Sequence, residues 1–199
     1  KTHLNPTQEN LDCITRNGVS KIIVTYRDFR DAAVALVYRL MAFPKPSNAP
    51  DYVDYNKIGF DNSLFHVLEN IDQDYIPWVT GWMEFTKKDK ERFHFTKFEE
   101  LKTDTIGSLK KVLKFYEISL SEDLIEQIVE RAKGKGNMRD NIVRSSVLPF
   151  GISSNFRSGK VGGWRNEFSN EHVVLAKKKI GQSLIDFGYE TDLDWNIER

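Results

Sequence analysis

The segment that most constrains the fold is a short apolar run at residues 21–26, Lys-Ile-Ile-Val-Thr-Tyr. An Asn-Gly turn precedes this run, and the polar pair Arg27 and Asp28 follows it. A β-branched run bounded in this way predicts a buried strand, and its continuous apolar character favours a parallel one. An apolar helix is expected from Asp31 to about Met41, ahead of a proline-rich stretch. Strand, polar turn and helix together form half of a β-α-β unit.

The chain continues with alternating helix and strand signals. Residues 64–70 and 75–86 are predicted to be helical, and the second segment carries three aromatic side chains at helical spacing. Residues 92–98 alternate in polarity and predict a second strand. Residues 43–60 are rich in Pro, Asn and Asp and are expected to form a surface loop.

Three polar residues mark the starts of three further helices. Asp104, or Thr103 before it, can cap a helix that follows the second strand. Ser121 can cap the next, with an apolar face formed by Leu124, Ile125, Ile128 and Val129. Ser169 caps a last helix, whose buried face is expected to contain Val173, Ala176, Ile180 and Leu184. Together these elements predict one layered α/β domain over residues 1–199.

Composition limits the possible partners. The 29 Lys and Arg residues balance the 29 Asp and Glu residues, so the formal net charge is zero. This balance argues against a broad surface for nucleic acid, but not against a small anion pocket. A single cysteine, Cys13, allows no intrachain disulfide and suits a reducing compartment. No apolar run approaches the length of a membrane span.

Arg27 is the first candidate for anion binding. It follows a predicted parallel strand directly and precedes a helix. Ligands of open α/β sheets gather beyond the carboxyl ends of the strands, where helix N-termini also favour negative charge. An arginine at this point suits bidentate phosphate contacts. The alternative is that Arg27 only forms an ion pair with Asp28 or Asp31.

A glycine-rich basic segment at residues 156–166 is the second candidate. Its three glycines permit close approach of the backbone to a ligand, and Arg157 with the loop N–H groups could form an anion nest. Lys160 and Arg165 add positive charge. The longer stretch over residues 134–163 shows little periodicity and is either functional or mobile, so a plain flexible loop remains the alternative.

The histidines differ in what they can do. His3 could remove a proton from an acceptor hydroxyl, because an imidazole titrates near neutral pH. His66, His94 and His172 fall within predicted helices and a strand, where packing or surface roles are more common. No spacing of Cys, His and Asp suggests a structural metal.

Four segments in order resemble the sulfotransferase family, especially its cytosolic-type branch and bacterial relatives. Residues 1–4 (Lys-Thr-His-Leu) resemble the family's K-T-H-L-P segment, and residues 26–35 resemble its R-N/D-P-K/R-D-x-x-x-S segment. Residues 98–102 resemble Y-E-D-L-K, and residues 157–164 resemble R-K-G-x-x-G-D-W. The resemblance implies a parallel-sheet fold like that of P-loop NTPases and sulfuryl transfer from 3′-phosphoadenosine 5′-phosphosulfate (PAPS), which leaves 3′-phosphoadenosine 5′-phosphate (PAP).

The resemblance also assigns roles. His3 becomes the general base on the acceptor, and Lys1 neutralises charge on the transferring group. The residues implied to bind the donor nucleotide are Arg27, Arg157, Ser158, Gly159 and Phe98. Of these, the two arginines hold the 3′-phosphate with the N–H groups of Ser158 and Gly159, and Phe98 lies on the adenine side. Trp164 packs the loop, and no metal is expected.

Several departures from the family pattern stand out. Ala35 replaces the family serine that hydrogen-bonds the 3′-phosphate, and Gly163 replaces an aspartate. The family's dimer segment is poorly kept in residues 165–174. The family's first strand and donor loop precede the K-T-H-L segment, so the domain is expected to be incomplete at its N-terminus.

Two other functional classes remain open at this stage. One is a P-loop kinase for a nucleotide or small molecule, which needs Mg²⁺ ligands and a Walker lysine. The other is a non-catalytic module that binds the nucleotide. The acceptor is not specified: aromatic residues in 42–60 and 135–156 permit a hydrophobic alcohol or phenol, and a sugar or a carrier-bound substrate stays open as an alternative. A cytoplasmic location is expected, with a lumenal enzyme freed from its anchor as the alternative.

Overall fold

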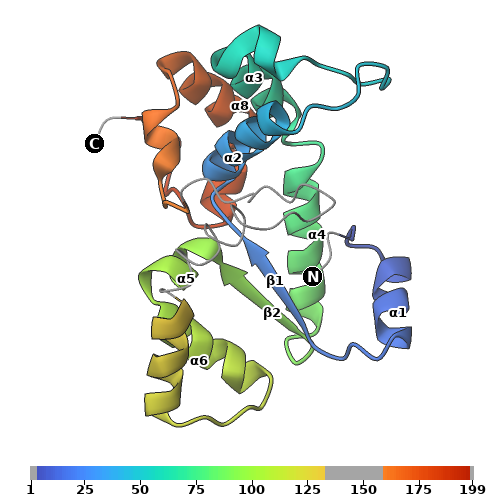
Figure 1. Cartoon of the computed structure of the whole chain (residues 1–199), viewed down its shortest axis with the longest axis vertical. Helices are drawn as coiled ribbons and strands as arrows, with labels where there is room; N and C mark the ends of the chain where they lie inside the picture. Colours follow the sequence, from blue (N-terminus) through green and yellow to red (C-terminus); the bar gives the residue numbers. More distant parts are fainter. Residues whose placement is uncertain (1–3, 133–158, 198–199) are drawn as a thin grey trace, which may run out of the picture.

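A small parallel sheet lies at the centre of the molecule, with helices around it (Figure 1). The structure is a computed structural model that describes residues 4–132 and 159–197. Strand β1 covers Ile22–Tyr26 and strand β2 covers Phe93–Lys97. They pair in parallel, with Ile22 opposite Phe93 and Tyr26 opposite Lys97. Both predicted strands and the α/β class are confirmed.

Helix α2 (Phe29–Ala42) confirms the helix expected after the first strand but begins earlier than predicted. Asp28, rather than Asp31, is its N-cap, and the Asp28 side chain accepts a hydrogen bond from the Arg30 N–H. The start differs because a capping carboxylate directly after a strand outweighs the apolar periodicity that begins later. Asp31 therefore lies in the first turn, buried at 3% exposure.

The predicted loop over residues 43–60 is wrong in its last part. Helix α3 runs from Tyr55 to Asn70, with Asp54 as its N-cap. Gly59 interrupts it with φ 78°, a conformation that favours glycine, so the helical pattern is broken near its start. Residues 43–54 do form a connector between α2 and α3.

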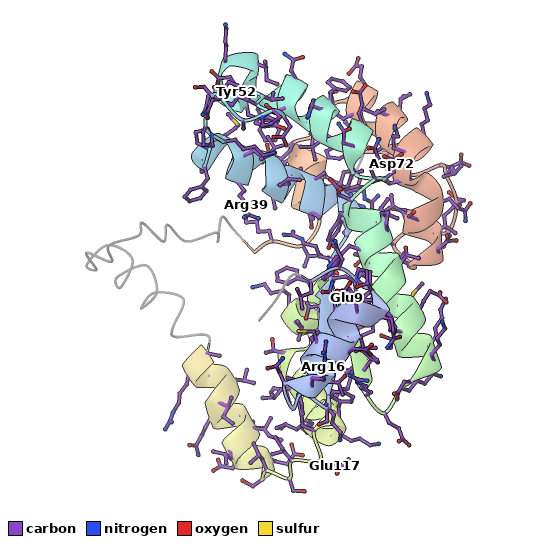
Figure 2. All side chains as sticks on the ribbon, turned by 90° about the vertical axis from the view of Figure 1, so that its right-hand side faces the viewer. Glu9, Arg16, Arg39, Tyr52, Asp72 and Glu117 are labelled. Atoms are coloured by element: carbon purple, nitrogen blue, oxygen red, sulfur yellow. The ribbon has the colours of Figure 1, made fainter. Side chains whose placement is uncertain are left out.

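Helix α4 (Tyr75–Lys88) confirms the aromatic helix, and α1 (Gln8–Arg16) is an element that the sequence patterns did not predict. Figure 2 shows α1 as the element nearest the viewer, with Glu9 and Arg16 marking its two ends. Its single buried residue is Leu11. The second, smaller core cluster contains Leu11, Val24, Trp82 and Phe93, so α1, β1, α4 and β2 share it.

The segments after β2 form a group of helices at the lower left of Figure 1. Helix α5 (Phe98–Thr103) starts at the residue after β2, and α6 (Thr105–Phe115) begins after its N-cap Asp104, as predicted. A further helix covers residues 122–132, and the Leu124 N–H donates to Ser121 Oγ at 3.3 Å. Its expected buried face is only half correct.

That helix buries one apolar row rather than two. Ile125 and Val129 are buried at 4% and 2% exposure, whereas Leu124 and Ile128 are 40% and 38% exposed. The two buried residues lie four positions apart and therefore share one line along the helix, while the other pair lies beside it.

The C-terminal part completes the main core. A 3₁₀ helix, η1 (Gly163–Asn166), precedes α8 (Asn170–Asp186), which starts with a capping box formed by Ser169 and His172. All four predicted core residues of α8 are buried. Helices α2, α3 and α8 pack together at the top of Figure 1, beyond the strand ends. None of the helices in the described ranges is both long and apolar enough to cross a bilayer.

Candidate functional site at the carboxyl ends of the strands

Two predicted site residues meet where the parallel strands end. Arg27 follows β1 and Phe98 follows β2, and the preceding residues Tyr26 and Lys97 are register partners. The guanidinium carbon of Arg27 lies 5.0 Å from the centre of the Phe98 ring. This is within the range of a cation–π contact. Parallel pairing therefore brings together two residues that are 71 positions apart in the sequence.

Arg27 forms one ion pair among the residues that the structure describes. Its Nη2 atom lies 3.2 Å from Asp31 Oδ2, so the ion pair considered from the sequence is present. Its backbone N–H donates to the Tyr75 hydroxyl at 3.4 Å. The Nε atom is buried and has no hydrogen-bond partner among the residues described. A buried donor without a partner is costly, and a ligand acceptor can satisfy it.

Asp31 connects Arg27 to the glycine-rich loop. Its Oδ2 accepts a hydrogen bond from the Gly162 N–H at 2.9 Å, and its Oδ1 accepts one from the Trp164 N–H at 2.9 Å. Gly159 and Gly162 have φ values of 59° and 71°, which favour glycine. The same carboxylate thus holds Arg27 and the loop that follows positions 157 and 158 in the sequence.

Glu99 fixes the turn that carries Arg27. One carboxylate oxygen accepts from the Asp28 N–H at 3.0 Å, and the other accepts from the Tyr189 hydroxyl at 3.0 Å. Burial, and then the charge and hydrogen bond of Glu99, raises the pKa of Tyr189. Burial likewise raises the pKa of Tyr75 to about 12. Both phenols therefore stay protonated near neutral pH and can donate hydrogen bonds.

Arg30, a buried arginine, supports the same turn through its contact with Asp28. Arg30 is 2% exposed, and its Nη2 atom lies 2.7 Å from Asp28 Oδ2. Its Nη1 atom pairs with Glu190. The guanidinium lies between the rings of Trp164 and Trp195, at 4.1 and 4.7 Å from their centres. Burial alone would lower the pKa of Arg30, but its two carboxylate partners outweigh burial and raise it.

Sequence patterns missed most of this support. The roles of Glu99, Tyr189, Arg30 and Glu190 depend on contacts between residues far apart in the chain, so no local spacing signals them. The sequence predicts Asp31 as the start of a helix and as a partner of Arg27, but not as the acceptor of two loop N–H groups. The structural role expected for Trp164 agrees with its complete burial.

Four predicted site residues lie outside the described residues: Lys1, His3, Arg157 and Ser158. The other histidines are placed as expected. His172 is buried in the α8 capping box, His66 lies on α3, and His94 lies on β2. Over residues 4–132 and 159–197, no group of three or more His, Cys, Asp or Glu side chains could hold a metal ion.

These features define a class of protein. Polar residues lie beyond the carboxyl ends of parallel strands, and an arginine donor beside a glycine-rich loop has no partner among the residues that the structure describes. Such an arrangement is typical of α/β domains that bind phosphate-bearing ligands. The family model described as the sulfotransferase domain matches residues 1–188. The chain therefore belongs to the sulfotransferase family.

Curated relatives agree with this assignment. Sulfotransferase 1C2 of Rattus norvegicus is 28% identical over 205 residues, and the alignment covers 96% of this chain and 64% of the rat protein. Sulfotransferase 1E1 of Homo sapiens is 27% identical over 197 residues, covering 89% of this chain and 58% of the human protein. The chain thus spans less than two thirds of the length of these relatives.

Solved structures show the same fold. Mouse sulfotransferase SULT7A1, complexed with PAP, matches with a TM-score of 0.63 and 22% identity over 94% of this chain and 69% of that one. Retinol dehydratase in complex with retinol and PAP matches with a TM-score of 0.56 and 26% identity, over 83% of this chain and 48% of that one. The kinase alternative gains no support from these matches.

Proposed function

We propose that the protein transfers a sulfuryl group from PAPS to an acceptor hydroxyl or amine, and that Arg27 holds the 3′-phosphate of the donor. The observation that carries this proposal is the buried Nε of Arg27, which has no partner within the described residues, directly after β1. Family membership supplies the reaction class, and PAP occupies the related structures named above. The non-catalytic alternative is an outcome of the tests below.

The groups proposed to bind the nucleotide are side chains and backbone N–H groups of this chain. Arg27 supplies charge-assisted donors to the phosphate, and Arg157 supplies a second set from the glycine-rich loop. Backbone N–H groups of Ser158 and Gly159 add donors. Phe98 presents an aromatic face beside Arg27, which suits a stacked adenine. Asp31 favours convergence of Arg27 and Arg157 on one phosphate, because it binds Arg27 and the loop segment that follows Arg157.

The two proposed catalytic residues, Lys1 and His3, are at the start of the sequence. When bound, the donor supplies an activated sulfuryl group. His3 removes the proton from the acceptor hydroxyl as the oxygen attacks in line. Lys1 neutralises negative charge on the transferring group, as cations do in phosphoryl transfer. The chain's contribution is position and electrostatics, and no metal is required in this scheme.

We propose a hydrophobic alcohol or phenol as the acceptor. Residues 43–54 form the connector beside α2, and Tyr52 lies there at the top of Figure 2. Phe43 and Ile58 are 42% and 36% exposed near this connector, so apolar surface is available. Retinol and androsterone, which are apolar alcohols, accompany PAP in the related retinol dehydratase structures. A cytoplasmic location is part of the proposal, consistent with the exposed free thiol of Cys13.

Calorimetry with two nucleotides tests whether Arg27 binds the 3′-phosphate. PAP carries the 3′-phosphate, and adenosine 5′-monophosphate lacks it. We expect Arg27→Ala to weaken PAP binding about 10- to 100-fold, since a charge-assisted hydrogen bond contributes about 1.5–3 kcal/mol. Binding of adenosine 5′-monophosphate should not change. Equal losses for both nucleotides would contradict the assignment of Arg27 to the 3′-phosphate.

A double-mutant cycle tests convergence. If Arg27 and Arg157 bind one phosphate, their effects on PAP binding should be coupled. The loss of binding free energy in the double variant should then differ from the sum of the two single losses. Arg16→Ala, on the far end of α1, is the matched control and should leave PAP affinity unchanged. Transfer from PAPS to a panel of phenols and alcohols then tests catalysis. PAP binding without transfer to any acceptor would favour the non-catalytic module.

A further inference from the structure

Two tryptophan side chains on α4 donate hydrogen bonds to one backbone carbonyl near the start of the chain. Trp78 Nε1 lies 2.9 Å from the Leu4 oxygen, and Trp82 Nε1 lies 3.2 Å from the same atom. The two indoles are four residues apart, so they project from one face of the helix. Leu4 directly follows His3 in the sequence.

Both donors are fixed by their own packing. Trp82 is 3% exposed and lies in the cluster shared by α1, β1, α4 and β2. Its ring centre is 6.1 Å from that of Phe93 on β2. Trp78 stacks on Tyr75 with ring centres 6.4 Å apart and planes inclined by 10°. The Tyr75 hydroxyl in turn accepts a hydrogen bond from the Arg27 N–H, so α4 also contacts the proposed nucleotide site.

The segment after Leu4 is held at two more points. The Asn10 side chain donates to the Asn5 carbonyl at 2.9 Å. Pro6 packs so closely on α4 that a Cβ placed on Gly81 would lie 2.4 Å from the Pro6 Cγ. The chain is therefore pressed against a glycine on the same helix that supplies the two indoles.

We infer that Trp78 and Trp82 are positioning residues, which hold the Leu4 carbonyl and thereby fix the point from which His3 reaches the acceptor. The inference rests on the proposed role of His3 as general base. Consecutive Cα atoms are about 3.8 Å apart, so a fixed Leu4 limits how far the Cα atom before it can move. Misplacement of a reacting group by about 1 Å can lower turnover about 100-fold.

The first test replaces each indole by a ring without the donor. In Trp78→Phe, Trp82→Phe and the double variant, we expect kcat for sulfuryl transfer to fall about 10- to 100-fold in the double variant. The Kd for PAP should stay within about twofold. Tyr116→Phe is the control, because it also removes a ring donor and Tyr116 is 39% exposed at the C-cap of α6. The control should keep its kcat.

A second variant displaces the segment while keeping both indoles. Gly81→Ala places a methyl group against the Pro6 ring and should lower kcat in the same way. Gly181→Ala, in α8, is its control, because the added methyl meets only the flexible end of Leu193. Hydrogen–deuterium exchange of residues 4–7 should quicken in Gly81→Ala and in the double tryptophan variant. Unchanged exchange in both would overturn the inference.

A cycle with His3→Ala separates this inference from the proposed function. If the indoles act through His3, the double tryptophan replacement should lower kcat little further once His3 is removed. Full additivity would overturn the positioning role while leaving the reaction itself intact. Parallel loss of kcat and PAP affinity would also overturn it, because that pattern indicates general damage. Wild-type protein that neither binds PAP nor transfers sulfate would instead refute the proposed function.

Discussion

The guanidinium of Arg27 rests on the ring of Phe98, with the guanidinium carbon 5.0 Å from the ring centre. The contact joins the residues that follow two adjacent parallel strands, so strand pairing brings them near each other. Phe98 is half-buried, and Lys102 Nζ also lies 6.0 Å from the centre of its ring. The pair of Arg27 and Phe98 thus links phosphate recognition to base recognition in the proposed nucleotide site.

Replacement of Phe98 should therefore weaken nucleotide binding without loss of fold. We expect Phe98→Leu to weaken PAP binding about 5- to 100-fold, because base stacking on an aromatic ring contributes about 1–3 kcal/mol and the cation–π contact adds to it. Phe98→Tyr, which keeps the ring, should stay near wild type. Isothermal titration calorimetry measures both.

Phe115→Leu provides the matched control for this prediction. Phe115 ends α6 and lies 5.5 Å from the ring of His94. It also contacts Lys21, which precedes β1 and so marks the opposite end of the strands. The control should bind PAP as the wild type does. If Phe98→Leu and Phe115→Leu weaken binding equally, the effect belongs to general packing and the stacking role is wrong.

Asp31 is expected to be the most sensitive carboxylate for stability. It is 3% exposed and accepts from two backbone N–H groups while pairing with Arg27. Asp31→Ala leaves those buried donors without partners and should lower the free energy of unfolding by about 3–5 kcal/mol. Urea denaturation measures this loss.

Asp51→Ala is the comparison for Asp31. Asp51 pairs with Lys45 in the connector between α2 and α3, and its side chain is 69% exposed. Water replaces such a contact readily, so the urea midpoint should not move measurably. Similar losses in the two variants would show that burial of Asp31 contributes nothing special.

The fold was predictable where local rules decide it. The strand over residues 21–26 and the helix capped by Ser169 follow from β-branched composition and from capping chemistry, and both are confirmed. Helix α1 was missed because it has only nine residues and its apolar face consists of little more than Leu11 and Ile14. The start of α3 was missed because Gly59 breaks the helical pattern near its beginning.

The candidate site divides in the same way. Arg27 could be proposed from its position after a strand, and the resemblance to a family added Phe98. The residues that hold them, such as Glu99 with Tyr189, become neighbours only through tertiary contacts across 90 positions. No periodicity or spacing records a contact of that length. A sequence therefore indicates which residues meet the ligand sooner than it indicates which residues hold them.

His94 should make stability fall in mild acid. Burial, and then the nearby Lys111, lowers the pKa of His94, while Glu100 opposes the shift. The unfolded state, with a histidine pKa of about 6.5, therefore binds more protons than the folded state as pH falls. This contribution to stability is complete above a pH of about 6.5 and is lost as pH falls from there through the lower pKa of the folded state.

Urea midpoints at about pH 7.5 and about pH 5.5 check the His94 prediction. The drop between the two should be smaller in His94→Gln than in wild type, because glutamine does not titrate. Lys111→Met should shrink the drop in part, since it removes the second cause of the shift. A His94→Gln protein with the full wild-type drop would show that other groups control the acid response.

Arg30 should tolerate no replacement well, and lysine should serve only partly. Its planar fork satisfies Asp28 through Nε and Nη2 while Nη1 reaches Glu190, between two tryptophan rings. Arg30→Met leaves two carboxylates without their cation and should lower the free energy of unfolding by about 3–5 kcal/mol. Arg30→Lys keeps the charge but cannot form the fork, so an intermediate loss is expected. Arg16→Met, on exposed α1, is the control for urea denaturation. Equal stability of the lysine and methionine variants would show that geometry alone, and not charge, decides the role of Arg30.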